Sequence, residues 1–265
     1  MNIVEYYTNG FVQSCLINGM IYRETAFISF DDNRSVRCIA VKNIHHLLSN
    51  MKRFKFFERK YNIYSSVARF DFSQMNRDFG FPPFSFQLDQ RAKDRQQFNQ
   101  ICSDYVLSYD FVLDFDDNGN FNATYKDVSV VKNQFDVLKI PYVLKFTGSG
   151  FHIIVPGKYL PPEWKDKPNM CRLLAEKMSA LYDLSTLDMK IYDLRRISKI
   201  SYSIDVKTGL VCYPLTDDEF DNFSKAIVSP QNVIKQNIFV RNSLLRDGYK
   251  TSFQKYARGV LNELS

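Results

Sequence analysis

Asp114 and Asp116 are the side chains of this sequence whose type and spacing best suit chemistry. They lie in the run 108–117, whose Val, Leu and Phe residues are typical of a β-strand. Strand side chains alternate between faces, so the two carboxylates share one face while the intervening apolar side chains point into a core. Paired carboxylates repel each other, and a hard cation such as Mg²⁺ or Mn²⁺ relieves that repulsion. The pair predicts a metal site; the simpler alternative is that Asp116 caps a turn and Asp114 is merely exposed.

The turn Thr147-Gly148-Ser149-Gly150 is a candidate phosphate site. It separates two predicted strands, and His152 lies just inside the second. Glycines let backbone N–H groups approach a ligand closely, and the two hydroxyls and the imidazole add donors. An ordinary tight hairpin with a hydrogen-bonded histidine remains the alternative.

A third group joins an acid to a basic run. Asp188 opens a short apolar strand and is a candidate third carboxylate, with Asp193 as its rival. An acid that holds metal, followed by bases that hold polyphosphate, suits phosphoryl transfer. A solvated basic face is the alternative for any one of these cations. The positive side chains that follow are Arg195, Arg196, Lys199 and Lys207.

The elements that must position these groups alternate irregularly, which favours an α+β fold over a doubly wound sheet. Helices are predicted over 3–17, 43–51, 89–103, 127–139, 168–183, 216–227 and 251–264. Strands are predicted over 23–30, 35–41, 64–72, 142–146, 151–155 and 187–191, with a hairpin over 201–215.

Composition narrows the class of protein. The 265 residues carry a net charge of +6, which favours a polyanionic partner. Basic and aromatic residues interleave over 51–61, where a nucleic-acid track competes with a solvated face over buried rings. Five scattered cysteines without a Cys/His cluster predict no zinc site and reduced, intracellular thiols. No apolar run approaches membrane-spanning length, so no membrane association is expected.

In their order along the chain, these groups resemble the motifs of the catalytic (small) subunit of archaeo-eukaryotic DNA primases. That family has an Asp-x-Asp strand, a Ser-Gly-x-Gly-x-His type turn, a later Asp, and a basic run leading to Ser-x-His-x-Lys-Thr-Gly. The last segment is Ser203–Gly209 here, and its spacing favours Asp188 over Asp193. The resemblance spans roughly 1–215. Ser149 and Asp205 stand where the family often has arginine and histidine.

The resemblance implies a primase-like catalytic core, a mixed or antiparallel sheet flanked by helices. Residues 118–146 contain no cysteine or histidine, so the family's zinc-bound knob is expected to be absent. We expect a single domain, 1–265. Its parts would be an N-terminal α/β half (1–105), a metal- and nucleotide-binding half (106–215) and closing helices (216–265).

The implied activity is template-dependent synthesis of short RNA (or DNA) primers on single-stranded DNA. Asp114, Asp116 and Asp188 would hold two Mg²⁺ or Mn²⁺ ions, one activating the attacking 3′-hydroxyl and one neutralising the triphosphate. The implied partners are nucleoside triphosphates, the DNA template and a primase large subunit. The implied nucleotide-binding residues are Thr147, Gly148, Ser149, Gly150, His152, Arg196, Lys199, Ser203 and Lys207.

Three other functions remain open. A repair or end-filling polymerase of the same superfamily would share the site without starting chains. A non-catalytic nucleic-acid-binding subunit would explain the departures at Ser149 and Asp205. A glycosyltransferase would explain Asp114 and Asp116 but not Asp188 and the basic run. The expected compartment is the cytoplasm in an archaeal or bacterial host and the nucleus in a eukaryote.

Overall fold

The computed structural model describes residues 2–32, 34–79, 102–117, 119–236 and 245–262. Its strands are β1 (Glu24–Ser29), β2 (Ser35–Ala40), β3 (Tyr61–Ser66), β4 (Ala68–Phe70), β5 (Val106–Tyr109), β6 (Phe111–Phe115), β7 (Val143–Phe146), β8 (Phe151–Val155), β9 (Ile197–Lys199) and β10 (Tyr213–Pro214). Its helices are α1 (Ile3–Thr8), α2 (Gly10–Met20), α3 (Ile44–Arg53), α4 (Phe72–Phe79), α6 (Phe121–Val137), α7 (Lys167–Tyr182), α8 (Asp217–Asp221), α9 (Pro230–Gln236) and α10 (Lys250–Asn262), with 3₁₀ turns η1 (Gly157–Tyr159) and η2 (Met189–Ile191).

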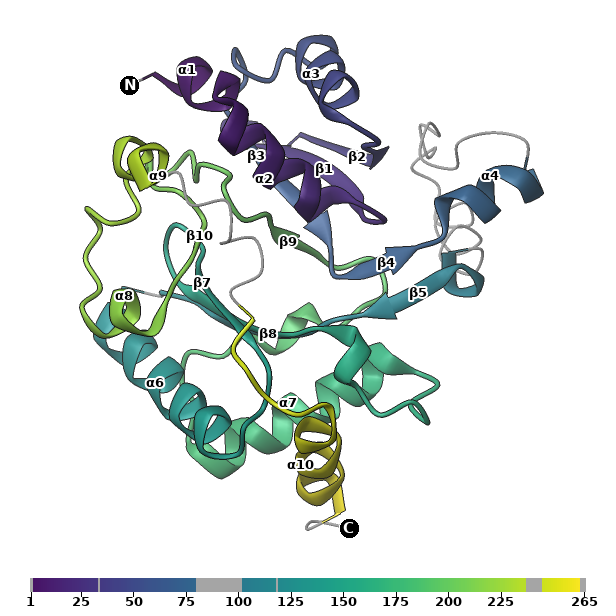
Figure 1. Cartoon of the computed structure of the whole chain (residues 1–265), viewed down its shortest axis with the longest axis vertical. Coiled ribbons are helices and arrows are strands. Elements are labelled where there is room, and N and C mark those ends of the chain that lie inside the picture. Colours follow the sequence, from purple (N-terminus) through teal and green to yellow (C-terminus); the bar gives the residue numbers. More distant parts are fainter. Residues whose placement is uncertain (1, 33, 80–101, 118, 237–244, 263–265) are drawn as a thin grey trace.

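Two four-stranded sheets organise these elements (Figure 1). The first has the order β2-β1-β3-β9 and the second the order β10-β7-β8-β6, and β4 and β5 form a separate short pair. All of these strand pairings are antiparallel. The predicted α+β class, with an antiparallel sheet flanked by helices, is confirmed.

Short polar caps set where several helices begin. Asn2 and Glu5 form a reciprocal capping box at the start of α1. The side chains of Asn43 and Asn120 accept hydrogen bonds from the first turns of α3 and α6. Asp166 does the same for α7. These local signals explain why the predicted helices over 43–51 and 168–183 are found within one or two residues of their expected ends.

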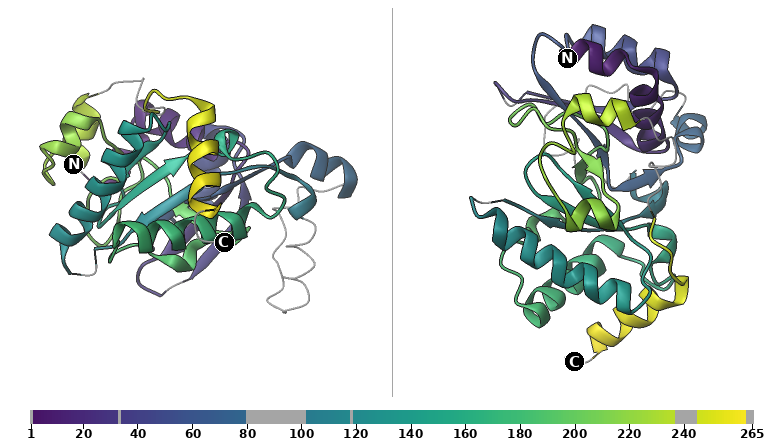
Figure 2. Two further views of the ribbon diagram at one scale, coloured as in Figure 1. Left: turned by 90° about the horizontal axis from the view of Figure 1, so that it is seen from below. Right: turned by 60° about the vertical axis from the view of Figure 1, so that its left-hand side comes forward.

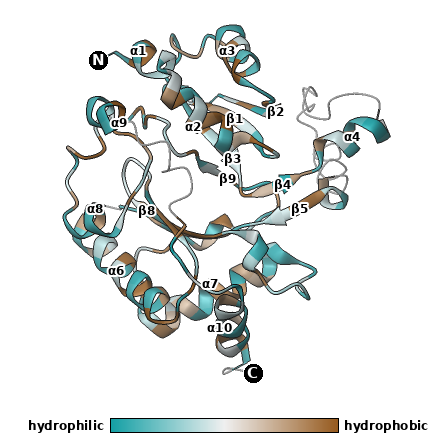
Figure 3. Ribbon diagram, in the orientation of Figure 1, coloured by the Kyte–Doolittle hydropathy of each residue, from teal (hydrophilic) through white to brown (hydrophobic). Residues whose placement is uncertain are grey.

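Helices cover the outer faces of the two sheets (Figure 2). The helices α1, α2 and α3 lie on the first sheet, and α6, α7 and α10 lie on the second. Between the sheets, the Lys145 ammonium on β7 donates to the Lys199 carbonyl on β9, at 2.6 Å. On the helix side, the ring of Phe111 lies 5.7 Å from that of Phe253 on α10. Figure 3 shows apolar residues along the central strands and hydrophilic residues on the outer helix surfaces.

Several predicted elements are different in the structure. The predicted strand 108–117 is broken at Asp110, because that carboxylate accepts a hydrogen bond from the Gly157 amide (2.9 Å) and pairs with Arg23. The predicted strand 187–191 was wrong, because Asp188 caps the 3₁₀ turn η2 instead. The predicted helix 3–17 is two helices that meet at Asn9, which caps the second.

Two predicted helices, 216–227 and 89–103, are found only in part among the described residues. The predicted helix 216–227 is only α8, followed by turns and α9. Most of the predicted helix 89–103 lies outside the described residues. Among the residues that the structure describes, no helix is long and apolar enough to cross a membrane.

Candidate active site

A row of polar side chains crosses the second sheet. Asp114 on β6 lies opposite His152 on β8, which in turn lies opposite Lys145 on β7. Side chains of directly opposed residues project from the same face of a sheet. This face is turned toward β9, because the Lys145 ammonium lies 3.3 Å from the hydroxyl of Ser198. The polar row therefore lies between the two sheets.

His152 links Asp114 to this row through both ring nitrogens. Its Nε2 lies 2.8 Å from the Asp114 Oδ1, and its Nδ1 lies 3.2 Å from the Ser198 Oγ. Burial lowers the pKa of His152 from its ordinary value, which favours a neutral ring. Lys145 donates to Ser198, so Ser198 can donate to Nδ1 and the Nε2–H can donate to Asp114. His152 thus orients Asp114, and neither ring nitrogen is turned toward the glycine turn.

Asp114 stays ionised although its side chain is largely shielded from solvent. Burial alone raises the pKa of the Asp114 carboxyl, but its contact with His152 and the charge of Arg196 hold the pKa below its ordinary value. Only 17% of its side chain is exposed. The carboxylate therefore carries a full negative charge at neutral pH.

Asp188 and Asp116 reach the same place through backbone pairing. The Asp188 amide donates to the Asp114 carbonyl at 2.8 Å, and the Asp116 amide donates to the Thr186 carbonyl at 3.0 Å. These bonds extend β6 by a bridge between Phe115 and its partner Leu187. The structure thus brings together the two chain segments that carry the three acids that the sequence predicted. The rival acid, Asp193, instead accepts a hydrogen bond from the Arg195 amide in the following turn.

A buried carboxylate on α6 anchors the segment that carries Asp188. One oxygen of Asp127 accepts hydrogen bonds from the amide and the hydroxyl of Ser185, at 2.7 and 3.2 Å. The same oxygen accepts from the amide and the hydroxyl of Thr186, at 2.8 and 3.0 Å. Since the Thr186 carbonyl in turn holds the Asp116 amide, Asp127 positions two of the three acids.

The pKa of the Asp116 carboxyl is raised above its ordinary value. Partial burial, together with the negative charges of Asp114 and Asp188, raises its pKa to about 6. A divalent cation would relieve this repulsion, and oxygen donors of this kind suit Mg²⁺ or Mn²⁺. Within the described ranges, no three or more His, Cys, Asp or Glu side chains are already gathered around one metal position. The donor set fits an ion that also takes water and substrate phosphate oxygens.

Replacing Asp116 with Asn should raise the melting temperature of the metal-free protein by roughly 1–3 °C when the pH is well above 6. The folded pKa of about 6 lies above the ordinary value of 3.8, so wild-type stability falls as pH rises between these values. Asparagine does not ionise, so the variant does not lose stability as the pH rises through this range. Thermal melts at several pH values measure the effect. An equal advantage below pH 3.8 would point to packing instead of charge.

The glycine turn packs directly against the end of β6. A Cβ at Gly150 would lie 2.1 Å from the Phe115 carbonyl oxygen, so only glycine fits there. The Thr147 hydroxyl accepts a hydrogen bond from the Gly150 amide at 3.1 Å and closes the turn. Gly148 has a φ of 101° and lies against the side chain of Asp205. In the described part of the chain, the amides of Gly148 and Ser149 donate no hydrogen bond, so both suit an anion.

Two predicted nucleotide-binding residues are occupied by partners within the protein. Lys199 forms an ion pair with Asp205. Burial alone raises the pKa of the Asp205 carboxyl, but Lys199 and the hydrogen bonds from Thr208 hold the pKa below its ordinary value. Ser203 is fully buried and donates its hydroxyl to the Ile200 carbonyl at 2.7 Å, so it does not face the site.

Two of the other predicted cations, Arg196 and Lys207, are more accessible. Arg196 is one-third exposed and lies 3.7 Å from the Asp188 carboxylate. Lys207 is exposed, and its amide donates to Asp205 at 3.0 Å. Arg195 is largely buried beside Glu24, at 3.6 Å, and belongs to the first sheet instead of the site. Among the predicted cations in the described residues, Arg196 is therefore the one that forms an ion pair with one of the three acids.

Three residues of this site were missed by sequence reasoning. Lys145 had a usable signal, because it is the only charged residue in the predicted strand 142–146. Asp127 stands at the start of the predicted helix 127–139, where an acid is commonplace. Ser198 had no signal, since its role depends on β9 lying against another sheet.

Comparisons with known proteins agree with this fold. No protein-family model matches the chain, and no curated protein matches it. Among solved structures, the polymerase domain of Mycobacterium tuberculosis Ligase D in complex with DNA matches with a TM-score of 0.53 and 11% identity, over 88% of this chain and 86% of that chain. The chain therefore shares its α+β fold with that domain.

Two further structures match less closely. The AEP domain of the cyanophage S-2L primase-polymerase has a TM-score of 0.42 and 12% identity, over 84% of this chain and 92% of that chain. The catalytic domain of primase RepB′ in complex with initiator DNA has a TM-score of 0.39 and 9% identity, over 85% and 91%. Both TM-scores are below the 0.53 of the Ligase D domain.

Proposed function

We propose that this protein is a template-dependent nucleotidyltransferase that synthesises short primers on single-stranded DNA. One observation carries the proposal: Asp114, Asp116 and Asp188 come from two chain segments in direct backbone contact, beside a glycine turn with unused amides. The polymerase-domain fold supports the same chemistry. In this proposal the whole chain, 1–265, acts as one catalytic domain.

The three acids would hold two Mg²⁺ or Mn²⁺ ions, which when bound would activate the attacking hydroxyl and offset the charge of the triphosphate. His152 donates to Asp114 and fixes the direction of its carboxylate. Asp127 holds the segment of Asp188 against β6. These contacts keep the acids in place before substrate binds, so little reorganisation is needed during the reaction.

The amides of Gly148 and Ser149 would bind triphosphate oxygens, and the exposed cations Arg196 and Lys207 would add positive charge. Lys199 would contribute less, because its ion pair with Asp205 offsets its positive charge. The Thr147 hydroxyl and Gly150 would shape the turn instead of binding ligand. A primase large subunit is the proposed protein partner.

The test is incorporation of labelled nucleoside triphosphates on a single-stranded template with Mn²⁺. Product on a template without primer supports primer synthesis. No product on primed and unprimed templates would contradict the proposal and favour a non-catalytic nucleic-acid-binding subunit. Chelation of the divalent ion should abolish incorporation, and added Mn²⁺ should restore it.

A second function, extension or filling of DNA ends, is favoured by the likeness to the Ligase D polymerase domain, which was solved in complex with DNA. Such an enzyme would use the same acids and the same glycine turn. It would extend a primed or gapped duplex and leave the unprimed template untouched. The comparison of those two substrates decides between the functions.

A further inference from the structure

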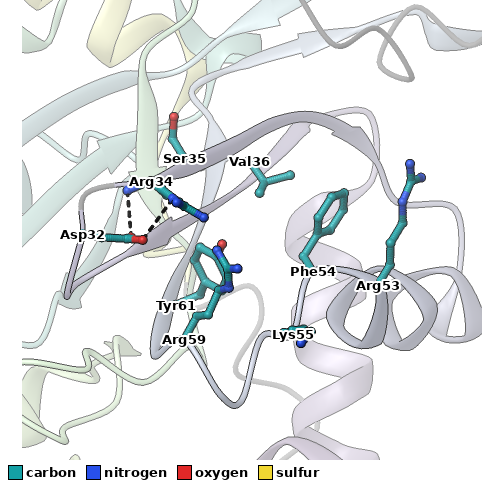
Figure 4. A pocket seen from close by; sticks show the side chains of 9 residues that line it. All are labelled: Asp32, Arg34, Ser35, Val36, Arg53, Phe54, Lys55, Arg59 and Tyr61. Atoms are coloured by element: carbon teal, nitrogen blue, oxygen red, sulfur yellow. Dashed lines mark hydrogen bonds and ion pairs between the residues drawn. The ribbon is translucent and has the colours of Figure 1, made fainter.

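A cavity of about 570 Å³ lies at one end of the first sheet (Figure 4). None of the three acids lines it. Its walls are the turn between β1 and β2 and the segment that joins α3 to β3. Arg34 and Arg59 point toward one another across it, and Arg53 extends from the opposite rim. Lys55 completes a set of four cationic lining residues, against one acid, Asp32.

Two of these four cations have an acidic partner, and the other two have none among the described residues. Asp32 pairs with Arg34 at 3.1 Å, and Lys55 lies 3.7 Å from Glu58. Among the described residues, no carboxylate lies within ion-pair distance of Arg53 or Arg59. Four cations less one acid leave a lining charge of about +3. A concave surface with this excess favours a polyanion.

Lys55 occupies a backbone conformation that glycine normally takes. The Phe56 amide donates to the Met51 carbonyl at 2.8 Å, and the Lys55 amide donates to the Lys52 carbonyl at 3.1 Å. These two bonds end α3 in a Schellman motif, whose left-handed position is usually glycine. Lys55 has a φ of 54° there, which costs roughly 1 kcal/mol. Glycine would relieve this strain, so Lys55→Gly removes a charge from the pocket rim without straining the backbone.

The pocket is connected to the candidate active site through β3. Tyr61, in the pocket wall, begins this strand, and Tyr64 pairs with Lys199 on β9, roughly 10 Å further along. Between them, the Asn62 side chain accepts a hydrogen bond from the Val206 amide at 3.0 Å. The loop that follows carries Lys207, which is exposed. The exposed Lys207 therefore follows directly on the point where this loop contacts β3, between the site and the pocket.

We propose that this pocket binds consecutive backbone phosphates of the nucleic-acid strand, and this inference rests on the proposed function. Arginine forks suit phosphate oxygens, and Lys55 adds a point charge. Phe56 and Tyr61 are buried, and Phe54, another ring of the pocket wall, is half-buried, so the four cations dominate the accessible lining. The contact is therefore electrostatic and independent of base sequence.

Lys55→Gly tests the proposal, because it removes a pocket charge and suits the left-handed backbone. We expect a single-stranded oligonucleotide of about 20 nucleotides to bind roughly 5- to 10-fold more weakly, with a salt slope lower by about 0.7. The melting temperature should stay equal or rise. Arg59→Gln should weaken binding similarly. The matched control is Lys52→Ala, which removes an exposed charge of the same helix end outside the pocket.

Fluorescence anisotropy of a labelled oligonucleotide measures these affinities with 5′-hydroxyl and 5′-phosphorylated strands. Equal losses on both strands support backbone binding. A loss confined to the phosphorylated strand would overturn it in favour of a terminal phosphate. Unchanged binding in Lys55→Gly and Arg59→Gln, or an equal loss in Lys52→Ala, would also overturn it. Failure of the proposed function is seen separately, as absence of nucleotide incorporation by the wild type.

Discussion

Asp114→Asn is expected to lower the rate of nucleotide incorporation by about 10³-fold or more while the protein stays folded. The substitution removes one negative charge from the set that Asp116 and Asp188 complete. It keeps a side-chain oxygen that can accept the hydrogen bond from His152, which is 2.8 Å long in the wild type. The loss should therefore be one of charge, measured as primer extension with Mn²⁺ at saturating nucleotide.

Asp117→Asn is the matched control for this experiment. Its carboxylate lies just beyond Asp116 and accepts a hydrogen bond from the Gly119 amide at 3.0 Å, which asparagine can also accept. This variant loses the same charge close to the site and should keep activity within about threefold of wild type, as expected of a partly screened surface charge. If Asp114→Asn retains more than a tenth of wild-type activity, the assignment of Asp114 as a metal ligand is wrong.

Asp127→Ala is expected to lower the free energy of unfolding by about 2–4 kcal/mol. The carboxylate accepts two amides and two hydroxyls from Ser185 and Thr186, and alanine leaves all four donors without this acceptor. The melting temperature should fall by roughly 5–10 °C. Because the same segment positions Asp188, the variant should also bind Mn²⁺ more weakly, as a melt with and without the ion would measure.

Asp221→Ala is a suitable control for the loss of a helical carboxylate. Asp221 ends α8, is exposed, and accepts no hydrogen bond among the described residues. It should change the melting temperature by no more than about 1–2 °C. Asp127→Asn should fall between wild type and Asp127→Ala, because one oxygen remains to accept. A small effect of Asp127→Ala on both stability and Mn²⁺ binding would show that the segment of Asp188 is held by other contacts.

The elements that the sequence predicted well carry local signals. The strands 23–30 and 35–41 and the helices 168–183 and 251–264 have clear hydrophobic periodicity or polar caps, and all four are found in the structure. The elements it predicted poorly depend on distant partners. The break at Asp110 follows from Arg23 and Gly157, and neither is near it in sequence.

The sequence by itself determined which side chains are available and in what order: two acids on a strand, a glycine turn, a later acid and a basic run. Only the tertiary structure decided their partners. In the folded chain His152 contacts Asp114, Lys199 forms an ion pair with Asp205, and Ser203 is buried. The physical reason is that strand register and the contact between sheets are set by long-range packing, which places residues 38 to 46 positions apart in hydrogen-bond contact without any local pattern.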